Sequence, residues 1–80
     1  MKIEVVLMLY DALMRGERIS RRTVCAEYCI SERTFYRYMR EVTDFLRKYK
    51  PEYVVDLSRS GSEYFAVKLP QSEKKNTINN

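Results

Sequence analysis

The spacing of apolar residues predicts helices up to Lys50 and strands after it. Between residues 2 and 15 apolar side chains recur at helical intervals, and Gly16 favours a helix end because glycine readily takes a left-handed conformation. The expected buried stripe of this helix is Ile3, Val6, Leu7, Tyr10, Leu13 and Met14, widened by Val5, Met8 and Leu9. A short second helix is predicted over 21–28, with Ser20 as its N-cap. Its expected buried residues are Val24, Cys25 and Tyr28.

A third helix is predicted from an N-cap at Ser31 to Tyr49, since Pro51 prevents it from continuing far past Lys50. On a helical wheel of about 100° per residue, one side carries Arg33, Tyr36, Arg37 and Arg40. The opposite side carries Phe35, Tyr38, Met39, Val42, Phe45, Leu46 and Tyr49. We expect the apolar face to pack against the fold and the arginine face to lie against a polyanion.

After Pro51 the period of the apolar residues changes from about 3.6 to 2. Alternation over 53–58 and 64–69 predicts a β-hairpin, whose turn at 59–62 includes Gly61 for a positive φ. A lone hairpin is marginally stable, so it must pack on the helices. The expected fold class is mainly α with a small β-hairpin, in one domain over residues 1–70. Residues 71–80 are polar and aperiodic, which predicts a disordered tail.

The basic charge is concentrated in one part of the chain. Of 80 residues, 45% are hydrophobic and 32% are charged, as is typical of a folded domain, and the net charge is +4. Residues 15–40 hold seven arginines against three glutamates, so this segment accounts for the whole excess. Such a cluster indicates an electrostatic footprint for a polyanion, although a solvated basic surface would have the same composition.

The composition argues against a membrane protein, a secreted protein, a metal-binding protein and an enzyme. No apolar run reaches the roughly 18–20 residues of a membrane span, and Glu4 and Asp11 interrupt the stretch that could suggest a signal peptide, so we expect a cytoplasmic protein. Cys25 and Cys29 lie four apart and histidine is absent, so we expect reduced, packed thiols and neither metal nor cofactor. The sequence has no histidine, no carboxylate pair in a predicted cleft and no glycine-rich phosphate loop. We therefore do not expect an enzyme.

The connection between the second and third helices has the residues of a helix-turn-helix. The close helix crossing needs a small residue (Cys25), and the turn needs an adaptable residue (Cys29) followed by an apolar one (Ile30). With the hairpin, the pattern describes a three-helix winged helix-turn-helix. Residues 19–25 and 30–40 resemble the N-terminal DNA-binding domain of DeoR-type bacterial transcription regulators, the modules that precede WYL sensor domains and the biotin-repressor class. Cys29 stands where those families usually have glycine, and Tyr38 where aspartate is common.

The resemblance implies sequence-specific binding of double-stranded DNA by a transcriptional regulator such as a repressor, with the third helix in the major groove. Near the start of that helix, Arg33 and Arg37 are the expected base readers, because arginine pairs bidentately with guanine. Tyr36 is expected to contact a thymine methyl group or a phosphate. The expected DNA-backbone contacts are Arg21, Arg22, Ser31, Thr34, Arg40 and, on the hairpin wing over 53–69, Arg59.

Two alternatives remain open from the sequence. The arginines could form ordinary surface pairs, Arg37 with Glu41 and Arg40 with Asp44. The same fold could also serve as a protein-interaction or oligomerisation module without direct DNA readout, which the broad apolar first helix would suit. We expect a homodimer, because one module buries only about 600–1,000 Å² on DNA. The sequence identifies no effector or sensor domain.

Overall fold

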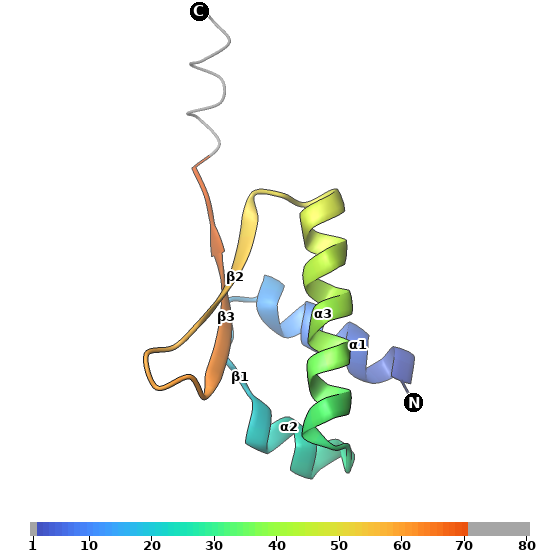
Figure 1. The fold of residues 1–80 in the computed structure, drawn as a ribbon. Helices are drawn as coiled ribbons and strands as arrows, with labels where there is room; N and C mark the ends of the chain where they lie inside the picture. Colours follow the sequence, from blue (N-terminus) through green and yellow to red (C-terminus); the bar gives the residue numbers. More distant parts are fainter. Residues whose placement is uncertain (1, 71–80) are drawn as a thin grey trace, which may run out of the picture.

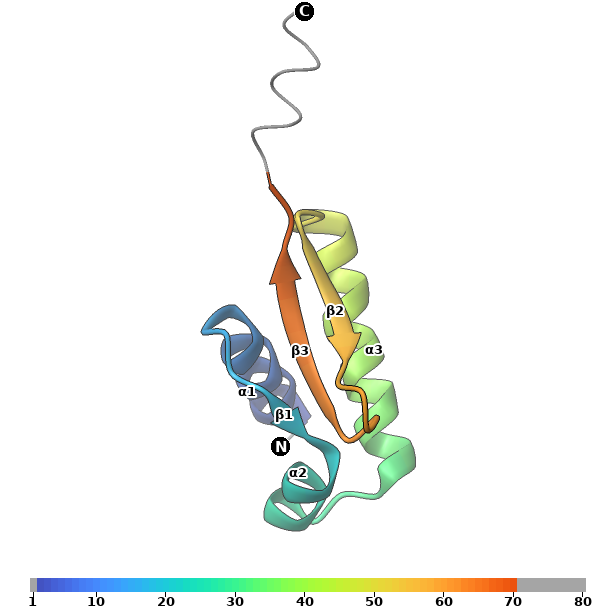
Figure 2. The ribbon, with the colours of Figure 1, turned by 90° about the vertical axis from the view of Figure 1, so that its left-hand side faces the viewer.

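The structure is a computed structural model that describes residues 2–70, so the expected tail at 71–80 lies outside the described residues. In chain order its elements are α1 (Lys2–Met14), β1 (Ile19–Ser20), α2 (Arg21–Tyr28), α3 (Glu32–Tyr49), β2 (Tyr53–Leu57) and β3 (Glu63–Lys68). This part of the chain is mainly helical, as predicted. The antiparallel sheet lies beside α3 while α1 crosses behind that helix (Figure 1), and in the rotated view β2 runs alongside α3 while α1 lies on the other side of β3 (Figure 2).

The predicted helix boundaries are confirmed by their capping bonds. At the start of α2, Ser20 Oγ accepts a hydrogen bond from the backbone N–H of Thr23 at 3.3 Å. At the start of α3, Ser31 Oγ accepts one from the N–H of Thr34 at 3.1 Å. Gly16, with φ 79°, follows α1 in the left-handed region. Each helix therefore begins or ends where its local sequence offers a partner for an otherwise unpaired backbone group.

The connection between α2 and α3 is tight and turns on a left-handed residue. Cys29 ends α2 at φ 54° and ψ 48°, a region that residues other than glycine rarely adopt. The N–H of Ile30 donates to the carbonyl oxygen of Cys25 at 3.1 Å, which closes the turn. Cys25 packs against the core as expected, but Cys29 is exposed. The prediction of two packed thiols is wrong for Cys29 because neither neighbouring helix covers a residue beyond the last turn of α2.

β2 and β3 form the predicted antiparallel hairpin, with Val55 opposite Ala66 near its centre. In the turn, Gly61 has φ 77° and its N–H donates to the carbonyl oxygen of Ser58 at 2.8 Å. The predicted role of Gly61 is therefore confirmed. The hairpin packs on α3 through β2, which places its turn away from the helices (Figure 1).

The prediction of a two-stranded hairpin alone is wrong, because β1 adds a third strand. β1 pairs antiparallel with the free side of β3, so that Ile19 lies opposite Tyr64 and Ser20 opposite Glu63, and the strand order is β1-β3-β2. A strand of two residues is too short to show a period of two in the sequence. Ser20 thus belongs to the sheet and caps α2 at the same time, which joins these two elements directly (Figure 2).

The core lies between the sheet and the helices. Its buried members are Val5, Leu9, Ala12, Leu13, Ile19, Val24, Phe35, Tyr38, Met39, Val42 and Leu46. From α3 these are the predicted apolar residues except Phe45 and Tyr49, which are 44% and 60% exposed. The prediction is wrong for these two because they lie near the C-terminal end of α3, where the other elements leave part of the helix uncovered.

The predicted stripe of α1 is wrong for Ile3 and Leu7, which are 72% and 59% exposed. The helix is apolar on two opposite sides, and it packs the side that carries Val5, Leu9 and Ala12 against the rest of the fold. Hydrophobic spacing identifies a helix but cannot choose between two apolar faces. Although α1 is rich in apolar residues, no helix within residues 2–70 has both the length and the apolarity to cross a bilayer.

Candidate nucleic-acid interface

α3 presents a ridge of three arginines on the side opposite its buried stripe. Arg33, Arg37 and Arg40 are all exposed, and none forms an ion pair with another of residues 2–70. Their spacing of three and four residues places them along one line of the helix surface. The structure thus brings together both expected base readers and one expected backbone contact, with guanidinium donors that the described chain does not use. We refer to these three residues as the arginine ridge.

The acids that could have neutralised the ridge pair with other residues. Glu41 Oε2 lies 3.0 Å from Lys2 Nζ of α1, and Asp44 Oδ1 lies 3.4 Å from Arg47 Nη1. The two surface pairs that the sequence left open are therefore not formed within residues 2–70. Because these acids are occupied elsewhere, the positive charge of the ridge remains available to an external anion.

Arg21 and Tyr36, expected at the DNA backbone and the bases respectively, contact each other. Arg21 Nη1 donates a hydrogen bond to Tyr36 Oη at 2.9 Å, and Arg21 Nε lies 3.6 Å from Glu32 Oε2. The hydrogen bond to Tyr36 raises the pKa of the Arg21 guanidinium above its ordinary value, and the Glu32 carboxylate adds to the shift. This contact joins the first turn of α2 to the first turns of α3. Sequence spacing could not predict it, because Arg21 and Tyr36 lie fifteen residues apart.

Ser31 and Thr34 form a small polar cluster at the start of α3. Ser31 Oγ accepts the Thr34 N–H at 3.1 Å and donates its own hydroxyl proton to Thr34 Oγ1, also at 3.1 Å. Ser31 is thereby occupied as a helix cap, whereas the hydroxyl proton of Thr34 is left for another acceptor. Of the two expected phosphate donors, Thr34 is therefore the better placed.

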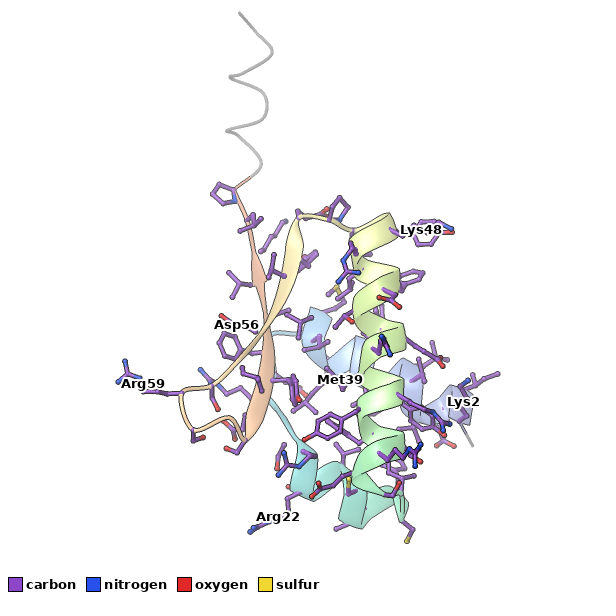
Figure 3. All side chains as sticks on the ribbon, in the orientation of Figure 1. Lys2, Arg22, Met39, Lys48, Asp56 and Arg59 are labelled. Atoms are coloured by element: carbon purple, nitrogen blue, oxygen red, sulfur yellow. The ribbon has the colours of Figure 1, made fainter. Side chains whose placement is uncertain are left out.

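The remaining two expected residues project from other elements. Arg22 extends from α2, and Arg59 extends from the β2–β3 turn away from the body of the protein (Figure 3). Both are exposed, and neither has an ion-pair partner in the described residues. The structure does not bring Arg59 close to Arg22, since the two side chains point in different directions (Figure 3).

Three further basic residues lie outside the expected set. Arg47 and Lys48 are exposed in the last turn of α3, and the helical period alone could have assigned them to the ridge side. Arg18 stacks over the ring of Phe65, with its guanidinium carbon 4.5 Å from the ring centroid, and pairs with Glu63 at 3.6 Å. Arg18 thus serves to hold the chain before β1 against β3, a role that depends on the unpredicted strand pairing.

Comparison with known protein families, curated proteins and solved structures finds no match to this chain. A functional proposal therefore rests on the fold and on the geometry of the arginines.

Proposed function

We propose that this protein is a winged helix-turn-helix that binds double-stranded DNA sequence-specifically and acts as a transcriptional regulator. In this proposal α3 lies in the major groove and the β2–β3 hairpin is the wing. The observation that carries the proposal is the arginine ridge, which follows a tight helix-helix turn and has no ion pair within residues 2–70. An α-helix fits the major groove of B-DNA, and residues near its N-terminus reach the base edges.

Base reading is assigned to Arg33 and Arg37, which lie about 6 Å apart along the helix axis. Each can donate two hydrogen bonds to O6 and N7 of a guanine. Tyr36 lies on the same side of α3 and is 44% exposed, so it can contact a thymine methyl group or a phosphate, and its hydrogen bond from Arg21 fixes the position of the phenol. Because these residues are positioned on a capped helix, the site is pre-organised before DNA arrives.

Backbone contacts are assigned to the residues around this reading face. The hydroxyl of Thr34 and the positive end of the α3 dipole suit a phosphate at the helix start. Arg22 and Arg40 would contact phosphates on either side of the groove, and Arg59 would place the wing on the flanking backbone or minor groove. Arg21 can add a phosphate contact through the guanidinium nitrogens that Tyr36 and Glu32 leave unused.

The second candidate function is a protein-interaction module. It is favoured by the uncovered apolar side of α1, where Ile3 and Leu7 are exposed. This surface and the arginine ridge occupy different parts of the molecule, so one protein can use both. The two functions separate experimentally, because DNA binding depends on the ridge and protein binding depends on the apolar side chains.

The test of DNA binding is selection of bound sequences from a random duplex library, followed by fluorescence anisotropy with the selected duplex and a scrambled one. We expect a recurring sequence containing guanine, and tighter binding to it than to the scrambled duplex. A plot of the logarithm of the binding constant against the logarithm of the salt concentration should fall with a slope of about −3.6 per bound copy. This value comes from about 0.9 for each phosphate neutralised by the four cationic backbone contacts, Arg21, Arg22, Arg40 and Arg59. Enrichment of no sequence, together with no binding at low salt, would exclude the proposal.

A further inference from the structure

One acidic side chain lies beside the arginine ridge at the start of α3. Glu32 is the first residue of this helix and the only acid in its first two turns. Its side chain is 67% exposed, so the carboxylate belongs to the surface and not to the core. It directly precedes Arg33, in the part of a groove-binding helix that reaches base edges. A negative charge here opposes the attraction of the arginines for phosphate, so its place on this surface calls for a role in recognition.

Arg21 holds Glu32 and Tyr36 in one row on α3. The Arg21 guanidinium, which comes from α2, lies 3.6 Å from Glu32 Oε2 through Nε and donates to Tyr36 Oη at 2.9 Å through Nη1. Glu32 and Tyr36 are four residues apart, so they lie one above the other on the helix surface. Arg33 and Arg37 form the parallel row one residue further on. The start of α3 therefore presents a row with one carboxylate next to a row of two guanidinium groups.

The carboxylate of Glu32 is held in place without being used as an acceptor. At 3.6 Å its contact with Arg21 is an ion pair, and Glu32 accepts no hydrogen bond from another of residues 2–70. The guanidinium groups of the ridge can only donate hydrogen bonds. Glu32 therefore adds a free, positioned acceptor to a surface that otherwise offers donors.

The base edges of the major groove decide what such an acceptor can bind. The donors there are the amino groups at N4 of cytosine and N6 of adenine. Adenine carries the acceptor N7 beside its amino group, which repels a carboxylate, whereas cytosine carries a C–H at that side. Guanine and thymine present the acceptors O6, N7 and O4, which repel it as well. Of the four bases, cytosine alone offers a donor to this carboxylate without an adjacent repulsive acceptor.

We propose that Glu32 determines specificity by accepting a hydrogen bond from a cytosine, beside the guanines assigned to Arg33 and Arg37. This inference rests on the proposed DNA-binding function and adds a base that the arginines do not read. Glu32 also acts against other sequences, because its charge repels phosphates and the acceptors of the wrong bases. Arg21 is the positioning residue, since it fixes the carboxylate from the neighbouring helix.

Selection of bound duplexes from a random library, by the wild-type protein and by two variants, tests the assignment. The wild-type sequence should contain a cytosine position beside guanine. Glu32→Gln should change that cytosine to adenine, because glutamine pairs bidentately with N6 and N7 of adenine. Glu32→Ala should leave the position without preference. Both variants should keep the guanine positions. A change of base identity cannot come from a lost contact with Arg21 alone.

Fluorescence anisotropy gives the size of the effect. For Glu32→Ala, the ratio of Kd on a scrambled duplex to Kd on the selected duplex should fall at least about 5-fold, the effect of one lost base contact. Binding to the scrambled duplex should tighten, because a charge that repels phosphates is removed. Glu27→Gln is the matched control: it removes the same charge from an exposed site on α2 that has no ion pair within residues 2–70. It should leave the base preference unchanged.

Circular dichroism melts show that each variant is folded before its binding is compared. A selective wild-type protein whose base preference is the same in Glu32→Gln and Glu32→Ala overturns the role of Glu32 and leaves DNA binding standing. An equal loss of preference in Glu27→Gln also overturns it, because the effect would then come from net charge. A wild-type protein that selects no sequence removes the proposed function itself, and the role of Glu32 falls with it.

Discussion

Replacing Arg33 with alanine should weaken binding to the selected DNA sequence while leaving the fold intact. Arg33 is exposed and has no ion pair within residues 2–70, so its side chain contributes little to the free energy of unfolding. Loss of a bidentate guanine contact costs about 1–3 kcal/mol, roughly 5- to 150-fold in Kd. The whole effect should therefore be seen in binding and not in the melting temperature.

Arg47→Ala is the matched control, because it removes the same side chain from the same exposed helix. Arg47 lies about 21 Å along the axis from Arg33, which exceeds the groove width of about 12 Å. Its guanidinium already pairs with Asp44 at 3.4 Å. We therefore expect Arg47→Ala to leave the Kd nearly unchanged when the start of α3 enters the groove.

Fluorescence anisotropy with the selected duplex, with single-base variants of it and at several salt concentrations separates the possible roles. Arg33→Ala should bind the selected and variant sequences more equally, whereas Arg22→Ala should weaken all of them and reduce the salt slope by about 0.9. Equal losses on every duplex for Arg33→Ala would refute its assignment as a base reader. An unchanged Kd for both Arg33→Ala and Arg37→Ala would refute the placement of α3 in the groove.

Three further predictions concern stability, measured by urea or thermal unfolding. Ser31→Ala removes the acceptor for the Thr34 N–H and should lower the free energy of unfolding by about 1 kcal/mol; no change would mean that another group caps α3. Cys29→Gly should stabilise the protein by up to about 1 kcal/mol because Cys29 adopts φ 54°, and a destabilised variant would contradict that backbone strain. Phe35→Ala should cost about 3–5 kcal/mol, since the ring is fully buried; a loss below 1 kcal/mol would contradict its place in the core.

Local sequence signals predicted the helices and the hairpin well. Ser20 and Ser31 have side chains that satisfy backbone donors, and Gly16 and Gly61 can take positive φ, so these residues mark element boundaries without help from the rest of the chain. The two faces of α3 were also predictable, because its apolar and basic residues separate at the helical period. These features depend on neighbours within a few positions.

Features that depend on distant neighbours could not be predicted. The pairing of β1 with β3 joins residues more than forty positions apart, and two residues are too few to show strand alternation. The buried side of α1 could not be predicted for a different reason. Both sides of this helix are apolar, and its packing against α3 decides which side is covered. For the candidate site, the positions of the ridge arginines followed from the period, whereas the bond between Arg21 and Tyr36 required the packed fold.

The double membership of Ser20, in the sheet and at the start of α2, has a consequence for engineering. Ser20 lies opposite Glu63 in the sheet and caps α2 through Thr23, so a displacement of the hairpin is transmitted to the first turn of that helix. Hairpin and helix are not separable parts. A chimaera that receives residues 53–68 from another protein should therefore also receive residues 19–28. With the foreign hairpin alone, α2 would be misaligned, and with it the start of α3.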